Sequence, residues 1–251
     1  MRRVVAVIGL VTACSSPARP REDEARGAPP VVRAIDAATL DAAPVDAAVP
    51  LDAAGPVIVD APMAWSEERA ALTLAYRRQH SDPDAADLVI VPHIIVLHYT
   101  DGGSATATRH YFDNVRIEGA RKELARAGAV NVSSHFVIDR DGTIYQLQPP
   151  ERFARHCIGL NHVAIGIENV GDEAKFPLTD AQVAADAALV RALAQRYPIT
   201  HLLGHHEVMR FRDHAEYVER DPGYRNDKPD PGPRFMARVR ARVADLGLRG
   251  P

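Results

Sequence analysis

Short apolar runs that alternate with helical patterns constrain the fold of this chain most strongly. Apolar, β-branched runs occur at 94–97, 164–168 and 201–203, and their length and composition are typical of buried strands. Stretches with helical spacing and capping residues lie between them and on both sides. From about residue 66 to residue 247, this order predicts an α/β fold, a single domain with a central mixed β-sheet flanked by helices.

Local signals give these elements approximate ends. Thr179 and Gln182 form a capping box ahead of a long amphipathic segment. The pair Asp141 and Gly142 lies between alternating runs at 134–138 and 143–147 and predicts a β-hairpin. Helices are expected at 66–79, 105–115, 122–127, 179–196 and 235–246.

The first residues have the pattern of an export signal. Two arginines at positions 2 and 3 precede an apolar run at 4–11, and small residues lead to Cys14. The run is too short to span a bilayer as a helix. Residues 11–14 resemble the bacterial lipobox, so we expect a lipoprotein signal peptide at 1–13 and lipid chains on Cys14 that anchor the protein in a membrane. The alternative is an ordinary secretory signal that contains a cysteine.

A segment of low complexity follows. Residues 14–62 are rich in Ala, Pro and Asp, repeat Asp-Ala-Ala four times and contain no aromatic residue. Such side chains bury too little surface to offset the loss of chain entropy. We therefore expect a disordered linker at 14–62 and a folded domain at 63–251, with order beginning near Trp65. The alternative, an Ala-rich helix, is disfavoured by prolines at 44, 50 and 56.

The charge balance excludes one large class of partners. The chain has 30 Lys and Arg against 33 Asp and Glu, a net charge of -3, so no overall positive field exists to hold a nucleic acid. Two cysteines, at 14 and 157, cannot form the disulfide framework of a small secreted scaffold. The eleven histidines are more informative about function.

Two histidines and one aspartate form a candidate metal site. His98 and His205 each follow a short apolar run, and Asp230 lies in the proline-rich loop 228–232. Two neutral imidazoles and a carboxylate are a three-ligand set for tetrahedral Zn²⁺ that leaves a fourth position for water. Spacing alone is a weak signal, because the ligands are far apart in the chain and each histidine could be a surface or core residue.

Five sequence blocks around these residues occur in a fixed order. They read IVLHYT at 95–100, SSHFVIDRDGTIYQL at 133–147, IGIE at 165–168, GHHE at 204–207 and KPDPG at 228–232. Together they resemble the zinc-dependent N-acetylmuramoyl-L-alanine amidases, a family shared with amidase-type phage lysozymes and peptidoglycan recognition proteins. The resemblance extends from about residue 94 to residue 235.

The resemblance implies a metal centre and a reaction. It places the zinc ligands on His98, His205 and Asp230, the general base or acid on Glu168, and the cation that stabilises the transition state on Lys228. Zinc would acidify a bound water and polarise the amide carbonyl, and a nearby carboxylate can move the proton to the leaving amine. The reaction implied is hydrolysis of the amide between N-acetylmuramic acid and the L-alanine of the stem peptide.

Several positions are open to more than one interpretation. Some relatives carry a tyrosine base where this chain has Ser134, so we assign the base to Glu168; a strand-edge glutamate in a salt bridge is the alternative. His156 matches a histidine near the substrate cleft of relatives, which leaves a substrate role, a supporting role and a structural role open. If the segment is extended, His205 and His206 point to opposite faces, so only His205 should bind metal and His206 should hydrogen-bond behind the site or face solvent.

Three further features need a structure to interpret them. We expect His135 to pack under the hairpin or orient a ligand. We expect Cys157 to be a free thiol, because relatives with a cysteine ligand place it where Asp230 lies here. Residues 209–227 are an insertion relative to compact relatives that could shape the cleft or merely cap it. If it displaced Lys228 or Asp230, their assigned roles would fail.

The predicted function is that of a cell-wall hydrolase. We expect an exported amidase, lipid-anchored in the cell envelope on the periplasmic side at the outer membrane, which acts as a monomer on peptidoglycan or muropeptides. The alternative is a non-catalytic peptidoglycan-binding module of the same fold. Such modules have lost a metal ligand, whereas all three matched ligands are present here. A zinc amidohydrolase for a different peptide amide shares the chemistry, and the sequence does not separate it.

Overall fold

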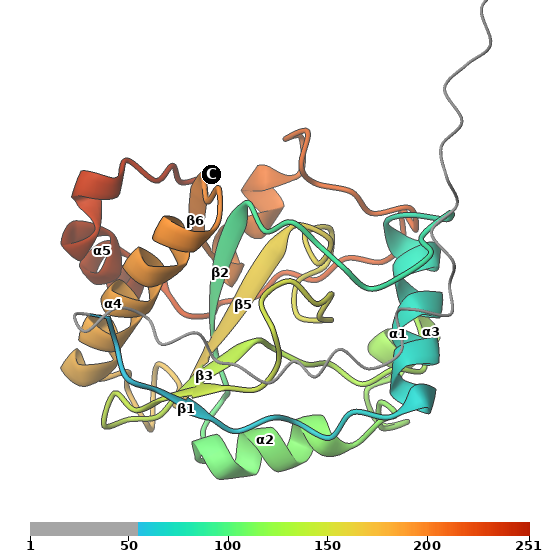
Figure 1. Ribbon diagram of the computed structural model, residues 1–251, viewed down its shortest axis with the longest axis horizontal. Coiled ribbons are helices and arrows are strands. Elements are labelled where there is room, and N and C mark those ends of the chain that lie inside the picture. Colours follow the sequence, from blue (N-terminus) through green and yellow to red (C-terminus); the bar gives the residue numbers. More distant parts are fainter. Residues whose placement is uncertain (1–54) are drawn as a thin grey trace, which may run out of the picture. The chain divides into compact units, whose positions relative to one another are not determined.

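A six-stranded mixed sheet forms the centre of the domain in the computed structural model, which describes residues 55–251 (Figure 1). The strand order is β1-β4-β3-β5-β2-β6. The strands are β1 (Ile58–Asp60), β2 (Ile94–Tyr99), β3 (Phe136–Ile138), β4 (Ile144–Gln146), β5 (Ala164–Asn169) and β6 (His201–Gly204). The helices are α1 (Glu67–His80), α2 (Ala105–Asp113), α3 (Lys122–Arg126), α4 (Asp180–Arg196) and α5 (Pro233–Arg242). The predicted α/β fold is confirmed.

The sheet is parallel at its centre and antiparallel at the hairpin. Strand β2 pairs in parallel with β5 on one side and with β6 on the other, and β5 pairs in parallel with β3. Strands β3 and β4 form the predicted antiparallel hairpin, with Gly142 at a φ of 89° in its turn. In the register of β2 and β5, His98 lies opposite Glu168. Two residues with expected chemical roles are therefore neighbours on adjacent strands.

Helices α4 and α5 cover one face of the sheet (Figure 1). Ile95 and Leu97 of β2 face these helices and share a buried apolar cluster with Val190 of α4 and Met236 of α5. Successive strand side chains point to opposite faces, so His98 lies on the other face. The chemistry expected from the sequence is therefore placed away from α4 and α5.

The opposite face has a less regular cover. Phe112 of α2 packs with Val137 of β3. Leu160 from a turn and Phe211 from a 3-10 helix pack with Val96 of β2. His98 and Glu168 lie near the carboxyl ends of β2 and β5. Ligand sites of open α/β sheets lie at such strand ends.

The helix ends follow their sequence signals. The Ser66 hydroxyl accepts a hydrogen bond from a first-turn amide of α1, and Thr179 and Gln182 form the reciprocal capping box of α4. Helix α5 begins earlier than expected, at Pro233. Proline is favoured at the first helical position, because the N–H that it lacks has no partner within the helix there. The predicted helices are otherwise confirmed near their expected ends.

The folded domain begins earlier than the sequence predicts. Strand β1 lies within the segment 14–62 that we expected to be a linker, and it pairs in parallel with β4. A three-residue edge strand gives too short a pattern to be recognised. The predicted signal peptide at 1–13, Cys14 and the linker up to residue 54 lie outside the described residues. From residue 55 onward, no helix has the length and apolar character needed to cross a membrane.

The insertion at 209–227 folds against α1. The buried His80 of α1 lies between two partners, because its Nδ1 is 2.8 Å from Oε1 of Glu219 and its Nε2 donates to the carbonyl of Ala127 at 2.6 Å. Tyr224 packs in the same apolar cluster as α1. The insertion is thus an ordered part of the domain.

Candidate metal centre

His98 reaches the site from β2, which lies between β5 and β6 in the sheet. Its side chain is 2% exposed and lies on the face away from α4 and α5. Its carbonyl accepts a hydrogen bond from Nδ2 of Asn169 at 3.4 Å. The strand pairs on both sides, so the backbone of His98 has rigid support.

His205 is presented by a tight turn after β6. It is the first residue of a 3-10 helix, His205–Phe211. Oε2 of Glu207 accepts the N–H of Gly204 at 2.8 Å and pairs with Arg240 of α5 at 2.5 Å. Arg240 also donates to a carbonyl of β6 at 2.7 Å. The turn is therefore tied both to its own strand and to α5.

Asp230 comes from the loop before α5 and is joined to this turn through the backbone. The N–H of His206 donates to the carbonyl of Asp230 at 2.8 Å, and Nδ1 of His206 donates to the same oxygen at 3.2 Å. His206 therefore hydrogen-bonds behind the site. The extended geometry that we considered for the two histidines is wrong, because they begin a 3-10 helix, yet only His205 faces the Asp230 side chain.

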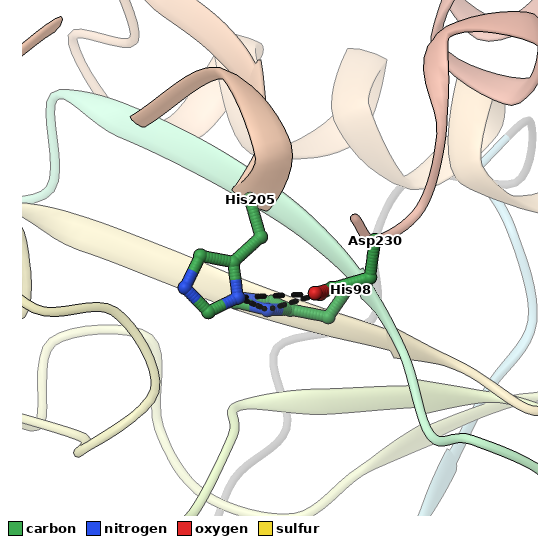
Figure 2. Close-up of side chains that lie close together, drawn as sticks. All are labelled: His98, His205 and Asp230. Atoms are coloured by element: carbon green, nitrogen blue, oxygen red, sulfur yellow. Dashed lines mark hydrogen bonds and ion pairs between the residues drawn. The ribbon is translucent and has the colours of Figure 1, made fainter. Parts of the chain in front are cut away.

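Three potential ligand atoms converge on one point (Figure 2). Nδ1 of His98 and Nδ1 of His205 are 3.0 Å apart, and each lies 3.2 Å from Oδ2 of Asp230. Tetrahedral zinc with bonds of about 2.0–2.1 Å separates its ligand atoms by about 3.3–3.4 Å. The triangle has nearly this size, so the residues fit a zinc ion. Between residues 55 and 251 no other group of this kind occurs.

Burial sets protonation states that suit a cation. Burial lowers the pKa of His98 to about 4, although Asp230 beside it acts in the opposite direction. Burial alone would raise the pKa of Asp230, but His205 and His98 outweigh this effect and hold the pKa far below its usual range. At neutral pH the cluster offers a neutral imidazole at His98 and an ionised carboxylate, the forms that bind metal.

His156 fixes the tautomer of His98 from behind. Nε2 of His156 lies 3.2 Å from the carbonyl oxygen of Ala164, and Nδ1 of His156 lies 3.0 Å from Nε2 of His98. Because a carbonyl oxygen can only accept a hydrogen bond, Nε2 of His156 must be the donor. His156 with its proton on Nε2 accepts the Nε2 proton of His98, which leaves Nδ1 of His98 free for a cation. Gly166 makes room for this ring, because a Cβ there would lie 2.7 Å from it.

Glu168 stands beside the cluster on β5. Burial raises the pKa of Glu168 well above its usual range; Asp230 adds to the rise, whereas Lys228 and Arg121 oppose it. Its Oε2 is buried and has no hydrogen-bond partner among the described residues. The alternative salt bridge does not form, since no ion pair in this part of the chain involves Glu168. A carboxyl group of this kind is suited to accept and return a proton.

One cleft of about 1140 Å³ contains the cluster and its neighbours. His98, His205, Asp230, Glu168 and Lys228 all line it. Residues 224–227 of the insertion line it too. The insertion therefore shapes the cleft, and it leaves Lys228 and Asp230 at the site.

His135 and Cys157 have structural surroundings. Nε2 of His135 donates to the carbonyl of Arg152 at 2.8 Å, and its Nδ1 accepts the N–H of Gly166 at 2.9 Å, so His135 packs between the hairpin and β5. Cys157 is a buried free thiol. Burial raises the pKa of Cys157 above its usual range, which disfavours a thiolate ligand. Ser134 is buried and bonds a nearby carbonyl.

The residues that support the candidate ligands could not all be recognised from the sequence. Glu207 follows Gly204 at the spacing of a capping box, and this signal could have identified it. Arg240 carries no such signal, because several arginines occur along α5. Asn169 follows the predicted strand at 164–168 and carries no signal of its own.

The fold and the cluster define this chain as an α/β protein with a candidate metal centre of two histidines and one aspartate. A family model described as N-acetylmuramoyl-L-alanine amidase matches residues 89–233, more than half of the chain. The chain belongs to the N-acetylmuramoyl-L-alanine amidase family.

Individual relatives agree with this assignment. The endolysin of Escherichia phage T7 is 34% identical over 100 residues, 38% of this chain and 66% of the endolysin. The 1,6-anhydro-N-acetylmuramyl-L-alanine amidase AmpD of Citrobacter freundii is 35% identical over 136 residues, 49% of this chain and 64% of that protein. This chain thus spans slightly less than two thirds of either relative. The structure of the N-acetylmuramoyl-L-alanine amidase LysC from Clostridium intestinale URNW has the same fold, with a TM-score of 0.51, 24% identity and coverage of 77% of this chain and 99% of LysC.

Proposed function

We propose that this protein is a zinc-dependent N-acetylmuramoyl-L-alanine amidase that hydrolyses the amide between N-acetylmuramic acid and L-alanine in peptidoglycan or muropeptides. The observation that carries the proposal is the convergence of His98, His205 and Asp230, whose facing atoms lie within 3.2 Å of one another in the cleft. Family membership supports the reaction class. The complete ligand set favours an enzyme over a non-catalytic binding module.

Different residues of the cleft have different roles in the proposed reaction. His98, His205 and Asp230 would hold Zn²⁺, which supplies an acidified water and polarises the substrate carbonyl. Glu168 accepts a proton from the attacking water and delivers it to the nitrogen of the leaving L-alanine. The raised pKa of Glu168 suits the second step, because a carboxyl group that holds its proton nearer neutral pH is at hand as an acid. Lys228 stabilises the negative charge that develops on the amide oxygen.

Mass spectrometry of the products formed from purified muropeptides tests this function. We expect a free stem peptide that begins with L-alanine. Glu168→Gln keeps the side-chain shape but cannot carry the proton, so kcat should fall by about 10²–10⁴-fold while the bound zinc remains. Glu67→Gln, an exposed change in α1, is the matched control and should keep full activity. Zinc-loaded protein that releases no stem peptide would contradict the proposal.

We also propose that the protein is exported and lipid-anchored on the periplasmic side of the outer membrane. The residues at 1–14 support this, and the following low-complexity segment would give the domain reach toward the cell wall. Metabolic labelling with a fatty acid tests the anchor. Label should appear on the wild type and be absent from Cys14→Ser; label that persists in the variant would rule out Cys14 as the lipidated residue.

A further inference from the structure

One wall of the cleft carries cations without ion-pair partners. They lie at the start of α3 and at the end of the insertion, and they are Arg121, Lys122, Arg225 and Lys228. None of them takes part in an ion pair within the described chain. Glu123 and Asp227 also line this wall, but neither pairs with any of the four. The wall therefore has an excess of positive charge that is available to an anionic ligand.

The buried side chain of Arg155 holds this wall in shape. Its Nη1 donates to the carbonyls of Gly128 and Val130 at 3.0 and 2.5 Å. Its Nη2 donates to the carbonyl of Leu124 at 2.7 Å and to the hydroxyl of Tyr224 at 3.0 Å. One guanidinium thus joins α3 to the insertion, and the cations on both are positioned before a ligand arrives.

Arg121 is the cation of this wall with the best-defined direction. Its Nη1 donates to the hydroxyl of Tyr111 at 2.8 Å, and its guanidinium carbon lies 6.0 Å from the centre of the Tyr111 ring. The remaining nitrogens form no hydrogen bond with residues 55–251. A guanidinium that is held at one nitrogen presents its other N–H groups as a fork for a carboxylate.

A different part of the cleft lining carries no cation. Between Tyr99 and Thr108 the lining residues are polar, small or aromatic, with Asp101 as the one charged group. This part suits the neutral sugar of a muropeptide, whereas the cationic wall suits the stem peptide, which carries carboxylates. The cationic part of the lining can therefore receive the carboxylates of the stem peptide.

We propose that Arg121 binds the free carboxylate on the second residue of the stem peptide, so that the enzyme prefers muropeptides with an acid at this position over those with an amide. The inference rests on the proposed amidase function, which puts the scissile bond beside Glu168. The carboxylate of the second residue is the first negative charge beyond that bond. Arg121 and Glu168 line the same cleft, so one substrate can contact both.

Two muramoyl tripeptides that differ only at this group test the proposal, because the bond to the third residue occupies the other carboxyl group of the second residue. One carries a carboxylate and the other a carboxamide on the second residue. Their kcat/KM values are compared for the wild type, Arg121→Gln and the matched control Arg126→Gln, which changes an exposed arginine of α3 that does not line the cleft. Binding of both peptides is also measured by calorimetry on Glu168→Gln, with and without Arg121→Gln, so that one comparison does not depend on turnover.

We expect the wild type to prefer the acid by about tenfold, mainly through KM. Arg121→Gln should remove the preference by weakening only the acid peptide, and Arg126→Gln should retain it. A preference that survives Arg121→Gln, or a wild type that does not distinguish the peptides, overturns the proposal. If the wild type cleaves neither peptide, the amidase function fails, and the calorimetric ratio with and without Arg121 still decides the role of Arg121.

Discussion

A buried carboxyl group on α4 makes the stability of this protein depend on pH. Asp186 is fully buried, and neither of its carboxyl oxygens has a hydrogen-bond partner in the described chain. Burial raises the pKa of Asp186 to about 8, and the Asn169 side chain offsets this only in part. The native protein therefore holds Asp186 protonated at neutral pH, whereas in the unfolded chain it ionises near pH 4.

Asp186→Asn should stabilise the protein at neutral pH, because Asn has the shape of the protonated acid and never ionises. The folded pKa is raised, so the contribution of Asp186 is fully present below about pH 4 and is lost as the pH rises toward 8. Each pH unit in this window lowers the free energy of unfolding of the wild type by about 1.4 kcal/mol. The unfolding free energy of Asp186→Asn minus that of the wild type should therefore be about 4 kcal/mol larger at pH 7 than at pH 4.

Urea unfolding at one-unit steps from pH 4 to pH 8 measures this difference. Groups common to both proteins cancel, so the difference in unfolding free energy isolates Asp186. Gln195→Ala, an exposed change in the same helix, is the control; it removes no ionisable group and should give a difference that does not vary with pH. A difference between Asp186→Asn and the wild type that stays constant across the range would refute a protonated, buried Asp186.

Two pairs of substitutions test the contact behind His98 and the packing of the insertion. His156→Phe should weaken zinc binding by about 10–100-fold in a chelator competition, because His98 loses the partner that fixes its tautomer. His156→Gln keeps an acceptor and should weaken zinc binding less. Equal zinc affinities of the two variants would argue against this role of His156. Gly159→Ala should lower the unfolding free energy by about 2–3 kcal/mol, since its Cβ would lie 2.3 Å from Tyr217 at a φ of +84°. Gly247→Ala has a positive φ but open space, and thermal unfolding should find it the more stable of the two.

Elements with local signals could be predicted from the sequence. Ser66 and Thr179 mark the starts of α1 and α4, and the apolar runs near residues 94 and 164 form β2 and β5. Strand β1 could not be predicted, because its stability comes from pairing with β4 and not from its own short pattern. The 3-10 turn at His205 depends likewise on distant contacts with α5.

The ligands could be predicted more readily than their supports. His98 and Asp230 are placed by a strand end and a stiff loop, which the sequence shows directly. Arg240 lies 33 residues beyond the Glu207 that it pairs with, and His156 lies 58 residues beyond His98. Neither contact has a local signature, so only the folded chain shows that these side chains hold the metal ligands in place.

We propose that His98, His205 and Asp230 hold one zinc ion on which the amidase activity depends. Titration of zinc into metal-free protein, with bound metal and muropeptide hydrolysis measured on the same samples, tests it most directly. Activity should rise with bound zinc and saturate at one ion per chain, and Asp230→Ala should lose both zinc binding and activity. Full activity without zinc, or unchanged zinc binding in Asp230→Ala, would contradict it.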